Sequence, residues 1–468
     1  MIQSARRYAE HHGLEATKLY WPDTAPSDWA TTRLKYTIRD SQNGVWGEEA
    51  DGGPDDVICV RVADFDRVRL RVRDDRLTVR SIPAGQRAQK AVQRGDLLLE
   101  KSGGGDLQPV GKVVLFDLAA PAVCSNFVAR LRVAANHDAR FLAYVHHAIY
   151  CARLNVPCIK QSTGIQNLDE DAYLAQKLPL PRLPEQQAIT AFLDRETAKI
   201  DGLIAKRERQ SELLAEKRTA LISHFITRGL DPTVTMKDSG VAWLGEIPAH
   251  WQTMPLKRCA SVQTGLAIGK KYGSQALVTR AYLRVANVQD GHILLDDMAE
   301  MAVPIGEARR HELQPGDVLM TEGGDFDKLG RGAVWHGELR GCLHQNHVFA
   351  VRPKPNLLLP EFLSALMSSF HGRTYFTLTS SQSTNLASTN TAKLGQFVVL
   401  RPPVSEQRVI MEFLQRQSAI SGRLAERLKA AIDLLREHRT ALITAAVTGQ
   451  IEVRGEAQIP AVSQGDPE

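Results

Sequence analysis

The sequence predicts an α+β protein in which two globular domains are separated by two long α-helices that pair as an antiparallel coiled coil. Three observations predict this fold: the second half of the chain repeats the first, each half begins with glycine-rich segments of β-type residues, and each half ends in a long proline-free stretch. The expected segments are 1–18 as an N-terminal segment, 19–182 as domain one, 183–230 as helix one, 231–242 as a linker, 243–403 as domain two, 404–450 as helix two and 451–468 as a C-terminal tail.

The repeat is the strongest feature of the sequence, and its register stays close to 221 residues. Matched pairs run through both halves: Gly95-Asp96 with Gly316-Asp317, Phe141-Leu142 with Phe362-Leu363, Glu185-Gln186 with Glu406-Gln407, and Arg218–Ile222 with Arg439–Ile443. Further upstream Trp29 matches Trp251 with a register one residue longer. So constant a register predicts two copies of one structural unit.

Each domain mixes short strands, glycine-rich turns and short helices. Residues 110–116 and 332–335 are predicted to be strands, and residues 141–150 and 361–370 are predicted to be short helices. This mixture indicates a compact α+β domain in each copy.

A long helix follows each domain. Pro184 suits the first helical position, and Glu185 lies in the first turn, where the helix dipole favours an anion. Apolar residues then recur every seven positions, as a two-helix coiled-coil seam requires. The predicted seam residues are Leu193, Ile200, Leu214 and Leu221 in helix one, interrupted by Arg207, and Leu414, Leu428, Leu435 and Leu442 in helix two, interrupted by Ser421. The alternative is that each helix packs only on its own domain.

Composition limits the class of protein. The chain is 43% hydrophobic and 24% charged, which is typical of a soluble globular protein, and it contains no apolar run long enough to span a membrane. Six cysteines are scattered without a CxxC pair, which disfavours a zinc ribbon and indicates a reduced, cytoplasmic setting. The net charge of +5 permits a nucleic-acid partner without requiring one. The arginine-rich stretch 61–80 fits either a solvated strand face or a phosphate-facing surface equally well.

No catalytic motif emerges from the sequence. The glycine-rich segments 102–106 and 322–325 lack the Gly-Lys-Ser/Thr of a phosphate-binding loop, and there is no Gly-x-Ser-x-Gly nucleophile motif and no convincing set of metal ligands. Binding is the remaining expectation, and the two domains differ in sequence far more than the two helices do. The candidate residues for contacts with DNA bases and phosphates are Lys101, Ser102, Lys160, Gln161 and Ser162 in domain one, and Lys328, Arg331, Ser380, Gln382, Ser383 and Asn385 in domain two.

At this point the chain resembles a known family, the specificity subunits of type I restriction–modification systems. The resemblance rests on 217–222 continuing into 238–251, on the helix starts 184–187 and 405–407, and on the helix end 441–449. It covers essentially the whole chain. One departure is residues 20–29, which replace the family's Gly-Glu-Ile-Pro-x-x-Trp pattern and leave the edge of the first domain open.

The resemblance implies a division of labour. Each target-recognition domain would read one half of a split double-stranded DNA site, and the two helices would set the unread gap and dock methyltransferase (modification) subunits, two of them. Motor-nuclease (restriction) subunits would join through those partners. S-adenosylmethionine, ATP and magnesium would belong to the partners, with no cofactor, metal or catalytic residue in this chain. Two alternatives remain: an enzyme that fuses DNA recognition with its own nuclease or methyltransferase activity, and a stand-alone DNA-binding regulator.

Overall fold

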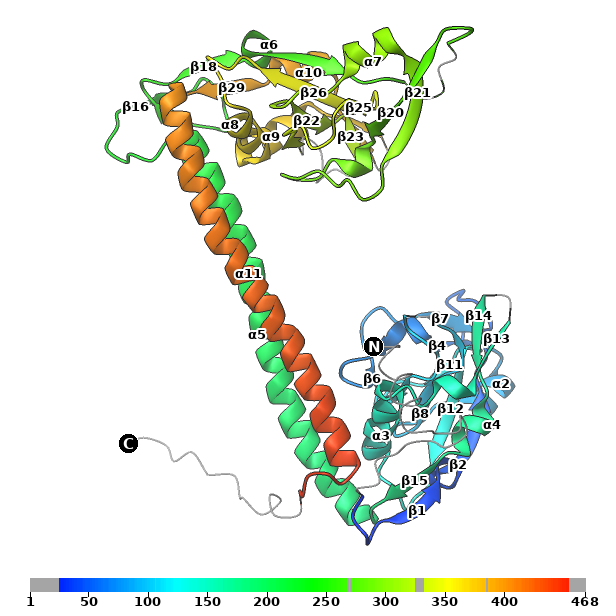
Figure 1. Cartoon of the computed structure of the whole chain (residues 1–468). Coiled ribbons are helices and arrows are strands. Elements are labelled where there is room, and N and C mark those ends of the chain that lie inside the picture. The colour runs from blue at the N-terminus through cyan, green and yellow to red at the C-terminus, as the bar shows by residue number, and fades with distance from the viewer. Residues whose placement is uncertain are drawn as a thin grey trace, which may run out of the picture. The chain divides into compact units, whose positions relative to one another are not determined.

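The computed structural model describes residues 25–453 apart from 106, 163, 268, 270–271, 325–331 and 384–385. The chain divides into two compact units. Unit 1 comprises Met1–Lys206 and Ala431–Glu468, and unit 2 comprises Arg207–Ala430. Helix α5 (Leu183–Arg228) begins in unit 1 and ends in unit 2, whereas α11 (Val404–Val447) begins in unit 2 and ends in unit 1 (Figure 1). No helix in the described part of the chain is both long and apolar enough to cross a membrane.

Unit 1 is built on a mixed six-stranded sheet of order β2-β12-β8-β10-β6-β5. Its strands are β2 (Ile38–Asn43), β12 (Val128–Val133), β8 (Leu97–Glu100), β10 (Val113–Leu115), β6 (Arg71–Val72) and β5 (Phe65–Asp66). A four-stranded sheet contains β11 (Ala122–Cys124), β4 (Asp56–Val60), β7 (Val79–Ser81) and β3 (Glu48–Glu49), and a three-stranded sheet contains β13 (Ile159–Ser162), β14 (Ile165–Leu168) and β9 (Ser102–Gly103). Strands β1 (Ala30–Arg33) and β15 (Lys177–Leu180) pair separately, and the short helices are α2 (Ala84–Lys90), α3 (Ala139–Cys151) and α4 (Glu170–Leu174).

Unit 2 repeats the main parts of this architecture. Its antiparallel sheet has the order β19-β26-β22-β24, with β19 (Ala260–Thr264), β26 (Val348–Pro353), β22 (Val318–Thr321) and β24 (Gly332–Val334). Further sheets contain β21 (Ala299–Pro304), β20 (Leu277–Leu283) and β25 (Leu343–His344), and β23 (Gly323–Gly324), β28 (Leu386–Ser388) and β27 (Ser381–Ser383). Pairs form between β18 (Gln252–Pro255) and β29 (Val398–Arg401), and between β16 (Met236–Asp238) and β17 (Glu246–Pro248). The short helices are α6 (Leu256–Cys259), α7 (Ile305–His311), α8 (Pro360–Ser368), α9 (Phe370–Thr379) and α10 (Thr391–Gln396).

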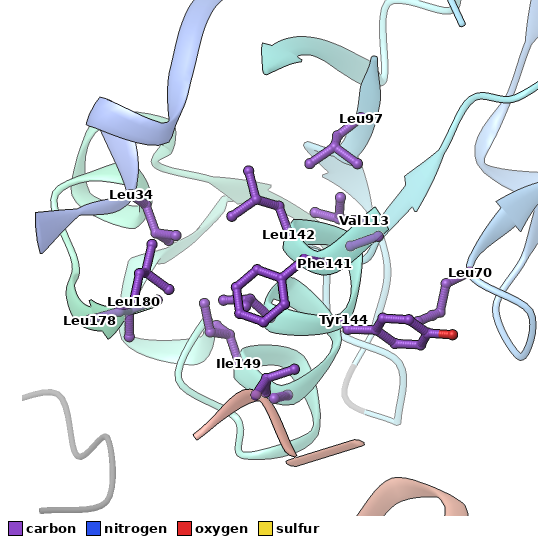
Figure 2. Close-up of a cluster of buried hydrophobic side chains, with 14 of the residues drawn as sticks. Leu34, Leu70, Leu97, Val113, Phe141, Leu142, Tyr144, Ile149, Leu178 and Leu180 are labelled. Atoms are coloured by element: carbon purple, nitrogen blue, oxygen red, sulfur yellow. The ribbon is translucent and has the colours of Figure 1, made fainter. Parts of the chain in front are cut away.

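The core of unit 1 forms around α3. Asp138 caps this helix by accepting a hydrogen bond from the Phe141 backbone N–H, and the helix then buries Phe141 and Leu142 completely. Figure 2 shows these side chains with Leu34 and Leu180 in one apolar cluster. Side chains from both long helices close the same cluster: Ile189 and Leu193 from α5, and Ile443, Ala446 and Val447 from α11. The start of α5 and the end of α11 are therefore anchored in the core of unit 1.

The two long helices pack against each other within each unit. In unit 1, Ile200 and Ile204 of α5 form a buried cluster with Ile432 of α11. In unit 2 the rings of Phe225 and Phe413 meet edge to face, with centroids 4.7 Å apart. In unit 1 the first half of α5 thus contacts the second half of α11, and in unit 2 the second half of α5 contacts the first half of α11. The pairing is therefore antiparallel. The predicted helix pair is confirmed, and the alternative of helices packing only on their own domains is wrong.

The predicted seam residues differ in burial. Leu193, Ile200, Leu414 and Leu428 are buried, whereas Leu214, Leu221, Leu435 and Leu442 are half-buried. Ile204 and Ile432 also belong to the buried cluster of unit 1. Ile204 lies four residues after the predicted seam residue Ile200, and Ile432 lies four residues after Leu428. The covered stripe is therefore wider than a strict seven-residue seam, as expected where a helix packs on a domain as well as on a partner helix.

The start of each long helix is fixed by the same contacts in both copies. The Gln186 side-chain oxygen accepts from the Asp138 backbone N–H at 2.9 Å, and its amide nitrogen donates to the Pro181 carbonyl. Gln407 makes the same two bonds, with the Leu359 backbone N–H and the Pro402 carbonyl. Both glutamines are completely buried, so these bonds satisfy polar groups that water cannot reach. The duplication seen in sequence is thus repeated in atomic contacts.

Candidate nucleic-acid interface

The candidate residues of domain one gather on the three-stranded sheet β13-β14-β9, which we call hairpin sheet 1. Strands β13 and β14 form a hairpin in which Gln161 lies opposite Gln166. The adjoining strand β9 pairs Ser102 with Asn167. The sequence separates Ser102 from Gln161 by more than fifty residues, and the sheet brings them onto neighbouring elements.

Backbone bonds tie Lys101 and Ser102 to Phe127, the residue before β12. The N–H groups of both residues donate to the Phe127 carbonyl, at 2.9 and 3.3 Å. The Lys101 ammonium lies 2.7 Å from the Asn43 side-chain oxygen and 3.0 Å from the Glu170 carboxylate. This pairing holds the lysine in place and leaves it only partly available to a phosphate, because a ligand must compete with Glu170.

Lys160 and Gln161 on β13 are the more accessible candidates. The Lys160 side chain is 78% exposed, and its ammonium pairs with Asp169 at 2.7 Å. The hydrogen bond to Lys160 lowers the pKa of Asp169, and the same bond raises the pKa of Lys160. Gln161 is exposed, and an exposed amide can donate to and accept from a base edge. The side chain of Ser162 lies outside the described part of the chain.

Apolar side chains lie beside these polar groups. Phe127, whose backbone carbonyl accepts from the Lys101 and Ser102 N–H groups, is 45% exposed. Ile165, at the start of β14, is 50% exposed. Apolar contacts of this kind suit thymine methyl groups and unstacked bases. Hairpin sheet 1 and the residues beside it therefore combine amide, hydroxyl, cationic and apolar groups. Lys160 lies in register with Asn167 and Ser102, and Gln161 lies in register with Gln166 on the opposite face.

Unit 2 carries the equivalent sheet β27-β28-β23, which we call hairpin sheet 2. Its backbone pairs Gln382 with Ala387 and Gly324 with Ala387 as well, in the register of hairpin sheet 1. The Ser380 hydroxyl donates to the Thr377 carbonyl at 3.1 Å. The candidates Lys328, Arg331 and Asn385 lie outside the described residues, as do the side chains of Gln382 and Ser383.

Equivalent positions of the two sheets carry different chemistry. The Glu322 N–H donates to the His347 carbonyl at 2.9 Å, just as the Lys101 N–H donates to the Phe127 carbonyl. A lysine and a phenylalanine in unit 1 thus become a glutamate and a histidine in unit 2. The Glu322 carboxylate lies 2.5 Å from the imidazole of His347, which is 54% exposed. One scaffold therefore presents two distinct sets of hydrogen-bonding groups.

Several members of these surfaces were not among the predicted residues. Asn43, Phe127 and Asn167 contact the candidates of unit 1, and Glu322 and His347 occupy the matching places in unit 2. Their partners lie far away in sequence, so only the strand order reveals them. The repeat offered one signal, because it aligns Lys101 with Glu322.

The arginine-rich stretch 61–80 is largely engaged in the fold. Arg61, Arg67 and Arg71 pair with Asp64, Glu100 and Asp117, each at 3.1 Å. The guanidinium of Arg80 lies over the ring of Trp46, at 4.5 Å from its centroid. Arg69, Arg73 and Arg76 are exposed. Structural ion pairs therefore account for much of this stretch.

Strongly perturbed ionisable groups lie in the core of unit 1 instead of on hairpin sheet 1. Burial lowers the pKa of Lys112 to about 8, and its ammonium lies 2.7 Å from Nδ1 of His147. Burial also keeps the pKa of His147 well below its usual value, so the neutral imidazole can accept from the lysine. The repeat places Ala333 and Ser368 at these positions in unit 2. Among the described residues, no three histidine, cysteine or acidic side chains gather to hold a metal.

The chain is similar in sequence to known proteins. The family model described as "Type I restriction modification DNA specificity domain" matches residues 78–211. The EcoKI specificity subunit of Escherichia coli K12 is 23% identical, and the alignment covers 67% of this chain and 66% of that protein, just under two thirds. The MjaVIII specificity subunit of Methanocaldococcus jannaschii is 30% identical over 34% of this chain and 36% of its own length.

A solved structure supports the fold. The chain is similar to one from a study of the complex assembly and conformational transition of the type I R-M system, with a TM-score of 0.66 and 15% identity. The match covers 92% of this chain and 100% of that one. The fold defines a duplicated α+β protein with two paired long helices. In sequence the chain is similar to specificity subunits of type I restriction–modification systems.

Proposed function

We propose that this chain is the DNA sequence-specificity subunit of a type I restriction–modification enzyme and has no catalytic centre of its own. Each target-recognition domain, 19–182 and 243–403, reads one half of a split double-stranded DNA site. The observation that carries this proposal is the pair of equivalent hairpin sheets. They share Gln161 and Gln382 at one position but differ at others, such as Lys101 against Glu322 and Gln166 against Ala387. A duplicated scaffold that keeps its backbone pairing while changing its exposed groups suits the reading of two unlike half-sites.

The reading groups are proposed to come from the hairpin sheets. In unit 1 these are Lys101, Ser102, Lys160, Gln161 and Ser162, and in unit 2 they are Lys328, Arg331, Ser380, Gln382, Ser383 and Asn385. Exposed Gln161 is the strongest described candidate for a base contact. Lys160 is suited to a phosphate, because an ammonium group provides charge without a directional code.

The helix pair is proposed to set the gap between the half-sites. Helix α5 has 46 residues and α11 has 44. At ~1.5 Å per residue each helix is roughly 65–70 Å long, about two turns of B-DNA. Pairing stabilises both helices, because an isolated helix would leave its apolar stripe exposed to water.

The partners follow from the same assignment. Two methyltransferase subunits would dock on the helix pair, and motor-nuclease subunits would join through them. S-adenosylmethionine, ATP and magnesium would then be bound by these partners, and the assembly would work in the cytoplasm. The competing functions are an enzyme that combines DNA recognition with its own chemistry and a regulator that binds DNA alone.

Long-read detection of modified bases tests the proposal. The host strain, a strain lacking this gene, and the same strain with the gene restored are compared. The expected result is a methylated motif of two constant parts separated by a fixed gap, lost on deletion and recovered on restoration. Methylation that survives deletion would contradict the proposal, and methylation by the purified chain alone would support the fused enzyme.

A further inference from the structure

A carboxylate lies beside hairpin sheet 2 at the position where unit 1 carries a lysine. Glu322 directly precedes β23, and its backbone is bonded on both sides: its N–H donates to the His347 carbonyl at 2.9 Å, and its carbonyl accepts from the Thr389 N–H at 2.8 Å. In unit 1 the Lys101 backbone makes the same two bonds, the second with the Leu168 N–H at 2.8 Å. The two backbone positions are therefore equivalent, and the charge of the side chain is reversed.

The Glu322 side chain is oriented by a chain of hydrogen bonds. Its Oε2 atom lies 2.5 Å from Nδ1 of His347, and Nε2 of His347 lies 3.3 Å from the amide nitrogen of Asn346. A neutral imidazole that carries its proton on Nδ1 satisfies both contacts, because it donates to the carboxylate and accepts from the amide. Oε1 of Glu322 has no hydrogen-bond partner among the residues that the structure describes, and the side chain is 30% exposed. One carboxylate oxygen is thus held, and the other can accept from a ligand.

An oriented carboxylate discriminates among the groups that DNA presents. Phosphates repel it, so it is unsuited to a contact with the DNA backbone. In the major groove guanine presents two acceptors, thymine presents an acceptor and a methyl group, and adenine has its N7 acceptor beside its N6 amino group. Cytosine presents its N4 amino group without an acceptor of its own. A carboxylate therefore favours cytosine over the other three bases.

We propose that Glu322 reads a cytosine in the half-site of unit 2 by accepting a hydrogen bond from the N4 amino group, and that His347 positions the carboxylate for this contact. The proposal rests on the proposed function, which assigns hairpin sheet 2 to DNA. At the equivalent position of unit 1, Lys101 has donors only and cannot accept such a bond. The two domains therefore differ at this position in the kind of base edge that they can read.

Methylome sequencing of a strain that produces Glu322→Gln tests the proposal. An amide both accepts and donates, and glutamine pairs well with the N6 and N7 atoms of adenine. We therefore expect one cytosine position in one half of the methylated motif to admit adenine, while the other half stays unchanged and shows that the chain is folded. Glu300→Gln is the matched control, because Glu300 is exposed on β21, in another sheet of unit 2. An unchanged motif, or a change only at an A·T position, would overturn the proposal.

Duplex binding tests the amino group itself, and it decides the matter if Glu322→Gln abolishes methylation. The native complex, purified through a tag on this chain, is titrated with its motif and with duplexes in which one cytosine at a time is replaced by 2-pyrimidinone, which lacks the amino group. At one position the unaltered complex should lose about 10-fold in affinity, within the range of one good base contact. The complex with Glu322→Ala should bind both duplexes equally. An equal loss in both complexes at every cytosine would overturn the proposal, because the loss would then come from weaker base pairing.

A variant of the positioning residue separates orientation from folding. Phe127 makes the equivalent backbone contact in unit 1, so His347→Phe suits the scaffold but removes the donor to Glu322. We expect His347→Phe to relax the same cytosine position, and His347→Asn, which keeps a donor, to preserve discrimination there. Relaxation at a different position would contradict the role of His347.

Failure of this proposal and failure of the proposed function give different results. A motif that depends on this gene but has no C·G pair in one of its halves would overturn the reading of cytosine if Gln382→Ala relaxes that half, and it would leave the proposed function intact. If methylation in the host does not depend on this gene, the proposed function itself fails, and this is visible before any variant is made.

Discussion

The indole N–H of Trp251 donates to the Glu406 carboxylate at 3.0 Å, at the first turn of α11. In unit 1 the indole of Trp29 donates in the same way to Glu185, at 3.2 Å. Each tryptophan is buried and lies near the start of its domain, so this bond ties the beginning of the domain to the start of the long helix that follows it. Trp29 therefore takes the place of Trp251 although the sequence around it departs from the family pattern.

Removing the carboxylate should destabilise unit 2. Glu406→Ala leaves the buried indole N–H of Trp251 without a partner and also removes the contact with His250, at 2.8 Å. We expect a loss of about 1–3 kcal/mol in the free energy of unfolding, the cost of an unsatisfied buried donor. Urea denaturation measures it. Glu412→Ala is the control on the exposed side of α11, and equal stability of both variants would contradict this role.

The paired helices should fail at their buried positions and tolerate the same change at exposed ones. Leu428 is 8% exposed and Leu434 is 66% exposed. Leu428→Asp places a carboxylate in an apolar contact and should cost at least about 2 kcal/mol, whereas Leu434→Asp should change stability by less than about 0.5 kcal/mol. Partner assembly should weaken only with the first variant. If Leu428→Asp kept normal stability and normal partner assembly, Leu428 would not be part of the seam between the helices.

Buried histidines should make the protein sensitive to mild acid. Burial lowers the pKa of His146 and of His344 to about 4. Below pH ~6.5 the unfolded chain binds protons that the folded chain does not, so stability is present above this pH and is lost as the pH falls toward 4. Each histidine should cost about 1.4 kcal/mol between pH 7.5 and 5.5.

Urea denaturation at the two pH values checks this expectation. His146→Gln should reduce the pH dependence, and His438→Gln, at an exposed position of α11, should leave it unchanged. An unaltered pH dependence in His146→Gln would mean that this imidazole is protonated in the folded protein.

Lengthening both helices should lengthen the DNA gap. Four residues inserted after Arg209 in α5 and after its repeat counterpart Ala430 in α11 add about one turn, or ~6 Å, to each helix. At ~3.4 Å per base pair the gap should grow by about two base pairs, and both half-site sequences should stay the same. Methylome sequencing reads the result. A changed half-site with an unchanged gap would contradict the spacer role of the helices.

The sequence predicted the repeated parts of the fold well, because helix periodicity, glycine placement and the repeat register are local signals. The start of α5 at Leu183 and the pairing of α5 with α11 illustrate this. It could not predict the contacts that depend on strand order. Lys101 meets Phe127 and Asn43 only because β8, β12 and β2 are neighbours in one sheet.

The candidate site was predicted in part for the same reason. Ser102 and Gln161 were chosen for their residue types, and the structure brings them onto one sheet. The repeat aligns Asp201 with Gly422 and Arg439 with Arg218, yet only the structure shows that Asp201 and Arg439 form an ion pair in unit 1. A lost ion pair can be recognised only when its geometry in the other copy is known.

The central claim is that each unit reads one half-site, and a matched pair of variants tests it most directly. Gln161 on β13 and Gln382 on β27 occupy the same position in the repeat, opposite Gln166 and Ala387. Methylome sequencing of Gln161→Ala and Gln382→Ala should show relaxed specificity in one half of the motif for the first variant and in the other half for the second, with the gap unchanged. A substitution that alters both halves, or variants that relax the same half, would contradict the account.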